Sequence, residues 1–175
     1  MHLVTSSLML SSMINSVSLS SASLLLQTYF VVSVTLYVSR GSPPIPISSF
    51  YKSTSPTPLP PSSSLTFTPL PKTLATWEAP NPWLPIVQTT LVHPNEHLCK
   101  IQRALLHFAQ IYGGAAPGSF AHLPELEGAE VLDGTLFVRA AGLTADRVGW
   151  MREGQVNKAD GFMVWDFAGF YRLRA

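Results

Sequence analysis

The chain has 175 residues and is almost neutral, with 11 Lys and Arg against 10 Asp and Glu. Its length allows one domain with a sizeable core, and the absence of any basic cluster gives no indication of nucleic-acid binding. The single cysteine, Cys99, excludes an internal disulfide and a cysteine-only metal site, which fits a reducing compartment.

Charge is distributed unevenly along the sequence. Residues 1–39 contain no Asp, Glu, Lys or Arg, whereas residues 93–175 hold 8 basic and 9 acidic residues. Between them, residues 43–94 hold 13 of the 15 prolines. Because a soluble domain needs something to cover a long uncharged surface, we expect either a membrane or the rest of a larger protein to cover the first segment.

The first segment has three interpretations. The favoured one is a pair of buried helices, at residues 3–15 and 22–38, broken at Asn15 and Ser16. A membrane helix over residues 23–38 and a secretory signal are the alternatives, but the apolar core is short for a span and no basic residue precedes it. Residues 28–38 are also rich in β-branched side chains, so a strand stays open there.

The stretch from Pro43 to Pro85 is predicted to be irregular. Proline removes a backbone donor and restricts the preceding residue, so no helix or central strand is expected to run through it. We expect an extended connector that lies against a core through its large apolar side chains, which are Phe50, Tyr51, Trp77 and Trp83.

Two helices are predicted after the connector. In the first, Pro94 and Glu96 suit the first turn, an apolar stripe follows at 3–4-residue steps, and Gly113 with Gly114 ends the helix. The stripe consists of Leu98, Ile101, Leu105, Phe108 and Tyr112.

The second helix is predicted to begin at Asp133, acting as N-cap. One face is expected to carry Leu136, Ala140, Leu143 and Arg147, with Phe137, Ala141 and Val148 on its flanks. Gly142 weakens a helix and is often tolerated where another helix packs closely. The aromatic end, residues 161–175, is expected to dock on the core.

The sharpest chemical motif is His93-Pro-Asn-Glu96-His97, which matches the H-x-x-E-H pattern of inverted zinc peptidases. In that chemistry the two histidines bind zinc and the glutamate activates water. Pro94 disfavours a helical His93, however, and a third ligand is not recognisable among the available glutamates, Glu125, Glu127, Glu130 and Glu153. A capping or packing role for both histidines is therefore favoured over zinc binding.

Three blocks of the sequence resemble the questin-oxidase-like family of fungi. They are NPWLPIVQTTLVHPNEHLCKIQRALLHFAQIYGG (81–114), EVLDGTLFVRAAGLTADRVGWM (130–151) and WDFAGFYRLR (165–174). The resemblance implies a mainly α fold and an oxidoreductase that opens or oxygenates aromatic rings derived from polyketides, with NADPH and molecular oxygen as co-substrates.

The resemblance also implies a division of the chain. Residues 1–40 would be apolar helical segments of a truncated core, 41–92 a Pro/Ser-rich connector, and 93–175 the helical C-terminal part of the domain. Family members extend further on the N-terminal side, so we expect a C-terminal fragment, an incomplete domain whose missing N-terminal part would be its partner. Whether such a chain is an active enzyme stays open.

The residue-level expectations follow from the histidines. His93, His97 and His2 are the candidate catalytic residues, and His93 with His97 the candidate metal ligands, because neutral imidazoles bind metals and transfer protons near pH 7. Trp165 and Phe167 could stack on an aromatic substrate. The expected location is the cytoplasm. A membrane-anchored helical protein without catalysis is the first alternative, and a zinc hydrolase the second.

Overall fold

A computed structural model describes residues 2–60 and 80–152 of the chain. In this part the protein is mainly helical, with six α-helices, one short 3-10 helix and no strand, which confirms the predicted fold class. The chain divides after Ile45 into two compact units, which are described separately here. The aromatic end, including Trp165 and Phe167, lies outside the described residues.

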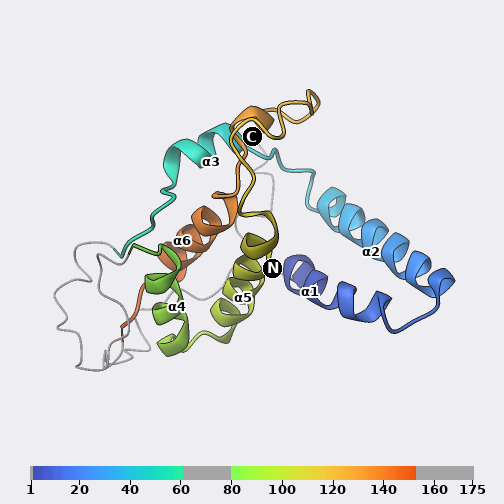
Figure 1. Cartoon of the computed structure of the whole chain (residues 1–175), viewed down its shortest axis with the longest axis horizontal. Coiled ribbons are helices and arrows are strands. Elements are labelled where there is room, and N and C mark those ends of the chain that lie inside the picture. Colours follow the sequence, from blue (N-terminus) through green and yellow to red (C-terminus); the bar gives the residue numbers. More distant parts are fainter. Residues whose placement is uncertain (1, 61–79, 153–175) are drawn as a thin grey trace. The chain divides into compact units, whose positions relative to one another are not determined.

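The first unit contains a helical hairpin (Figure 1). Helix α1 spans His2–Ile14 and helix α2 spans Leu19–Ser39. The hydroxyl oxygen of Ser18, the N-cap of α2, accepts a hydrogen bond from the Ser21 backbone N–H at 3.2 Å. This cap starts the helix three residues earlier than predicted, because it satisfies a backbone donor that would otherwise be unpaired.

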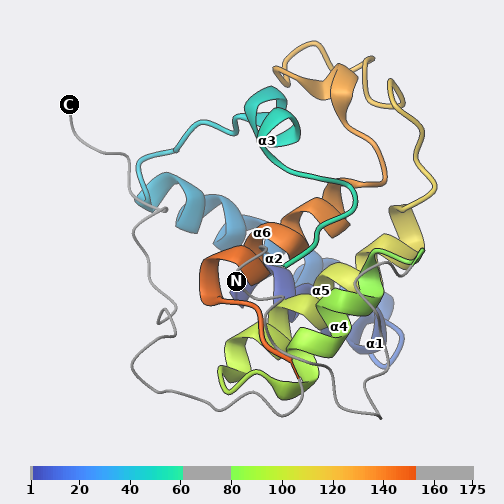
Figure 2. The same ribbon diagram turned by 90° about the vertical axis from the view of Figure 1, so that its left-hand side faces the viewer.

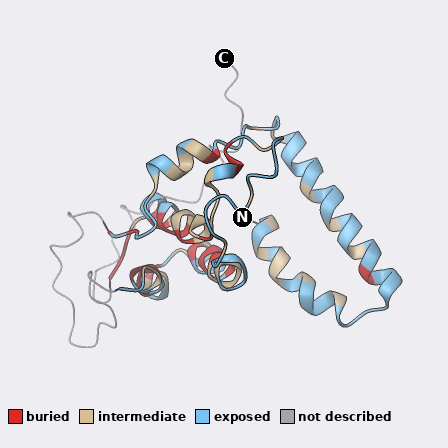
Figure 3. Ribbon diagram, turned by 45° about the horizontal axis from the view of Figure 1, so that its top comes forward, coloured by how far each residue is buried: buried red, intermediate tan, exposed pale blue. Residues whose placement is uncertain are grey.

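The helix pair predicted in the first segment is confirmed, with the break near Asn15, and the strand alternative for residues 28–38 is wrong. The Tyr29 hydroxyl on α2 donates to the Leu3 carbonyl on α1 and ties the two helices together. Ala22 is the one buried residue described in either helix, so the described residues do not themselves supply the cover that the sequence predicts for this segment (Figure 3).

The second unit is built around three helices: α4 (Trp83–Val92), α5 (Glu96–Tyr112) and α6 (Leu136–Val148). Helices α5 and α6 share the largest contact, and α4 packs against both (Figure 2). Small side chains let α5 and α6 approach closely, because Ala104, Ala141 and Ala145 are fully buried. Ile86, Leu98 and Val148 are among the larger apolar residues buried in the same unit.

Helix α5 is the element that the sequence predicted best. Leu98, Ile101 and Leu105 of the predicted stripe are buried, and Gly113 is the C-cap. The predicted place of Pro94 in the first turn is wrong, since the helix begins at Glu96 and the Asn95 side chain caps it by accepting from the His97 backbone N–H at 3.0 Å. Asn95 can satisfy an orphan N–H in this way, whereas Pro94 has no donor or side-chain acceptor to contribute.

Helix α6 begins at Leu136, three residues after Asp133. Thr135, not Asp133, occupies the N-cap position, and Asp133 Oδ1 accepts from the Thr135 backbone N–H at 2.8 Å. The buried face includes Ala141 and Val148 from the predicted flanks, not the face that carries Leu143. Leu143 is exposed, while the buried positions are Val138, Ala141, Gly142, Ala145 and Val148. The small residues determine which face of α6 is buried, because they let α6 pack more closely against the neighbouring helices than Leu143 would.

The proline-rich stretch is more helical than predicted. Helix α3 (Ile47–Ser53) occupies a proline-free interval, and its basic residue Lys52 lies in the last turn. Helix α4 contains Pro85 within its first turn, where the missing N–H costs no intrahelical bond. Proline therefore marks the boundaries of these helices. The 3-10 helix η2 (Ala129–Val131) contacts α3.

Candidate functional site

His93 lies at the junction of the three core helices. It is the C-cap of α4, and its side chain is buried, with 9% exposed. The Nδ1 atom accepts a hydrogen bond from the Asn95 backbone N–H at 3.0 Å. The Nε2 atom lies 3.2 Å from the Val148 carbonyl oxygen and, in the tautomer that this pattern requires, donates to it.

This geometry gives His93 a definite structural role. The Val148 carbonyl belongs to the last turn of α6, where helix carbonyls lack an intrahelical partner. The imidazole satisfies that carbonyl and also joins the end of α4 to the start of α5. Burial lowers the pKa of His93 below its ordinary value, because the protein interior disfavours the charged imidazolium.

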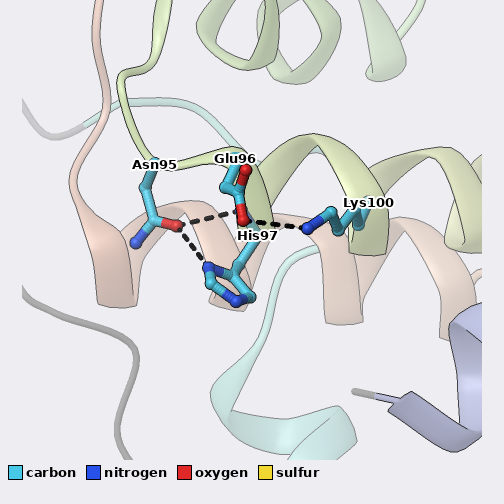
Figure 4. A network of polar contacts seen from close by, with 4 residues as sticks. All are labelled: Asn95, Glu96, His97 and Lys100. Carbon is cyan, nitrogen blue, oxygen red and sulfur yellow. Dashed lines mark hydrogen bonds and ion pairs between the residues drawn. The ribbon is translucent and has the colours of Figure 1, made fainter.

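His97 is held in a separate polar group at the start of α5 (Figure 4). Its Nδ1 lies 3.2 Å from the Asn95 side-chain oxygen, which also accepts from the His97 backbone N–H. Glu96 forms an ion pair with Lys100 at 2.9 Å, one turn along the helix. The hydrogen bond from Lys100 holds the pKa of the Glu96 carboxyl below its usual value.

The three elements of the zinc motif therefore have partners within the protein. A metal at His93 would have to displace one of its two hydrogen bonds, and Glu96 is already paired with Lys100. Among residues 2–60 and 80–152, no three His, Cys, Asp or Glu side chains gather in a way that could hold a metal ion. The arrangement matches the capping and packing interpretation, and the metal role of His93 and His97 stays a prediction.

His2, the third predicted catalytic residue, begins α1 in the first unit, whereas His93 and His97 belong to the second. Cys99 lies on α5 with its side chain exposed. Dinucleotides are commonly bound where a glycine-rich turn joins a strand to the start of a helix. The described part of the chain contains no strand, and none of its glycines with positive φ begins an α-helix. It does not offer this kind of NADPH site.

An aromatic cluster is the feature that sequence reasoning missed. Phe108 and Tyr112 on α5 stand 6.4 Å apart between ring centroids, and Phe137 on α6 lies 6.3 and 6.2 Å from them. The three ring planes differ by 22–30°. His107 meets Phe108 edge to face at 5.3 Å. The four-residue spacing of Phe108 and Tyr112 was visible in the sequence, but their pairing with Phe137 depends on how α5 and α6 pack.

The aromatic cluster is partly open to solvent. Tyr112 is 55% exposed, and Phe108 and Phe137 are half-buried. Near-parallel aromatic rings that remain accessible can bind a planar aromatic molecule by stacking, which contributes about 0.5–1.5 kcal/mol per pair beyond the burial of area.

Comparison with known proteins gives one family. The family described as questin oxidase-like matches residues 1–105 of the chain, which covers α1 to α4 and most of α5. No curated protein and no solved structure matches. The resembling blocks at 130–151 and 165–174 lie beyond the matched residues. Because the match covers more than half of the 175 residues, the chain belongs to the questin oxidase-like family.

Proposed function

We propose that this chain is part of an oxidoreductase that oxidises polyketide-derived aromatic rings, with NADPH and molecular oxygen as co-substrates. The observation that carries the proposal is the family match over residues 1–105. In such a reaction one oxygen atom enters the substrate and the other leaves as water, with the two electrons coming from NADPH.

The aromatic cluster supports the substrate class. Phe108, Tyr112 and Phe137 present near-parallel rings, and Tyr112 is the most exposed of the three. A planar polyketide ring system is the kind of ligand that stacks on such a surface. The His107 imidazole lies beside this surface, with its ring 5.3 Å from that of Phe108.

The test is an assay of the full chain with questin, the substrate that names the family. We expect NADPH oxidation and oxygen uptake in equal amounts, and, under ¹⁸O₂, one labelled oxygen atom in the product. The same assay without questin is the control, since uncoupled NADPH oxidation would proceed there too. If no aromatic substrate stimulates NADPH or oxygen consumption, this chain alone is not the proposed enzyme.

A further inference from the structure

Helix α2 is apolar on all sides. Its exposed large side chains include Leu24, Leu26, Phe30, Val31, Val32, Val34, Leu36 and Val38. At 3.6 residues per turn these positions point around the whole helix instead of forming one stripe. A helix with a single protein neighbour needs only one apolar face. Packing against α1 therefore explains the apolar side chains on one side of α2 but not those on its other sides.

The dimensions of α2 match a bilayer. Leu19–Ser39 is the one helix in the described ranges that is long and apolar enough to cross a membrane, judged by length and composition. Its 21 residues extend for about 30 Å, which equals the thickness of the hydrocarbon core. Residues 1–39 contain no charged side chain, and the first one, Arg40, stands at the C-terminal end of α2.

Two polar side chains in the apolar part of α2, Gln27 and Ser33, have partners inside the helix. The Ser33 hydroxyl donates to the Tyr29 carbonyl at 2.7 Å, and the Gln27 amide donates to the Ser23 hydroxyl at 3.3 Å. Hydroxyl donation to a carbonyl one turn back lowers the cost of taking serine out of water. The same pattern occurs in α1, where Ser6 and Ser7 donate to the Leu3 and Val4 carbonyls.

The ends of α2 suit the two interfaces. At the N-terminal end the hydroxyls of Ser18, Ser20 and Ser21 form a polar group. At the other end Tyr37 lies in the last turn of α2 and Arg40 is the C-cap, and the Tyr37 hydroxyl donates to the Pro43 carbonyl at 2.8 Å. Tyrosine and arginine at a helix end are typical anchors at the headgroup level of a membrane.

From these four observations we propose that α2 inserts into a lipid bilayer and anchors the chain, with Arg40 at the headgroup surface. The proposal is independent of the oxidoreductase activity. Of the two covers that the sequence leaves open for the first segment, a membrane or the rest of a larger protein, the proposal takes the membrane.

The experiment mixes the full chain with phosphatidylcholine vesicles and separates bound from free protein by flotation, followed by a carbonate wash. We expect the chain to float and to resist the wash. Val32→Lys places a charge at the middle of α2, where insertion scales predict a loss of about 100-fold in partitioning. Leu91→Lys, on α4 at 70% exposed, is the matched control and should float like the unaltered chain.

Amide hydrogen exchange on the vesicles provides a readout that misfolding cannot imitate. We expect lipid to slow exchange in α2 while exchange in α4 to α6 stays unchanged. Three results would each overturn the proposal: the chain remains at the bottom of the gradient, Val32→Lys floats as well as Leu91→Lys, or the chain forms stable soluble oligomers that ignore vesicles. The last would show that a second copy covers α2.

Discussion

At the scale of single residues, His93 joins the ends of three helices through two hydrogen bonds. Its replacement by alanine removes both and leaves the Val148 carbonyl buried without its imidazole donor. We expect His93→Ala to lower the free energy of unfolding of the second unit by about 2–3 kcal/mol. Urea unfolding followed by tryptophan fluorescence measures this. His97→Ala, at a half-buried site, is the control and should cost less than about 1 kcal/mol.

The pKa of His93 also predicts how stability depends on pH. Because burial lowers this pKa, the unfolded chain binds the proton more readily than the folded one. Stability should therefore be unaffected by His93 well above pH ~6.5 and fall as the pH drops below that value. The measurement is the difference in unfolding free energy between the unaltered chain and His93→Asn across pH 5 to 8. A difference that stays constant over this range would contradict the burial argument.

Tyr112 tests the aromatic cluster as a substrate surface. Removing its ring by Tyr112→Ala should raise KM for an aromatic substrate by about 2- to 10-fold, which corresponds to one lost stacking pair, with a smaller change in kcat. Ile111→Ala is a matched control, since Ile111 is the neighbouring residue, is 56% exposed and does not belong to the cluster. If both substitutions changed KM equally, the aromatic cluster would not be part of the binding surface.

At the scale of elements, Gly142 is where α6 meets the chain segment after α3. A Cβ atom at this position would collide with Pro58 Cβ and lie 2.8 Å from Pro58 Cγ. The neighbour that explains this glycine is therefore a segment outside any helix, whereas the sequence suggested a second helix. Close approach, not flexibility, requires glycine here.

Gly142→Ala should consequently destabilise the protein even though alanine is the better helix former. The gain in helix propensity is about 1 kcal/mol, and the expected cost of displacing Pro58 is about 1–3 kcal/mol. Thermal unfolding of the variant measures the balance. Gly114→Ala is the control, because a Cβ there meets no atom within 4 Å. A stabilised Gly142→Ala variant would show that the Pro58 segment moves freely.

Another link between elements runs through Tyr51 of α3. Its hydroxyl accepts from the Asp133 backbone N–H at 3.0 Å, and the Arg139 guanidinium of α6 lies 4.7 Å from its ring centroid. Arg139 also donates to the Tyr51 and Thr54 carbonyls. Burial raises the pKa of Tyr51, so the phenol stays neutral at physiological pH. These contacts fix α3 to the start of α6 without an ion pair.

How far the sequence predicted these elements depends on how local their causes are. Helix α5 followed from its apolar spacing and from the glycines at its end, which are local signals. The start of α2 could not be predicted, because several neighbouring serines could equally serve as the N-cap and only the structure shows that Ser18 does. The buried face of α6 could not be predicted either, because the burial of Ala141 depends on tertiary packing. The histidine pair was found by spacing, but its hydrogen-bonded partner, Val148, lies 55 residues away.

At the scale of the whole molecule, low charge and exposed apolar helices predict poor solubility near neutral pH. The net charge is +1 at pH 7 and the isoelectric point is about 7.9. Little repulsion between molecules is then available to oppose association through α2. We expect light scattering to be greatest between pH 7 and 8 and to fall strongly when a mild detergent is added. Scattering that responds to neither pH nor detergent would contradict this prediction.

The exposed thiol on α5 has a practical consequence. Because Cys99 is the chain's single cysteine and its side chain is exposed, a maleimide dye or a spin label would attach at one defined point without any substitution. The attachment point is one turn from the Asn95 cap, on the helix that carries the aromatic cluster. A change in the label's spectrum on addition of an aromatic compound or of vesicles would therefore report a change in the surroundings of α5. The hairpin of α1 and α2 carries no label and would not contribute to the signal directly.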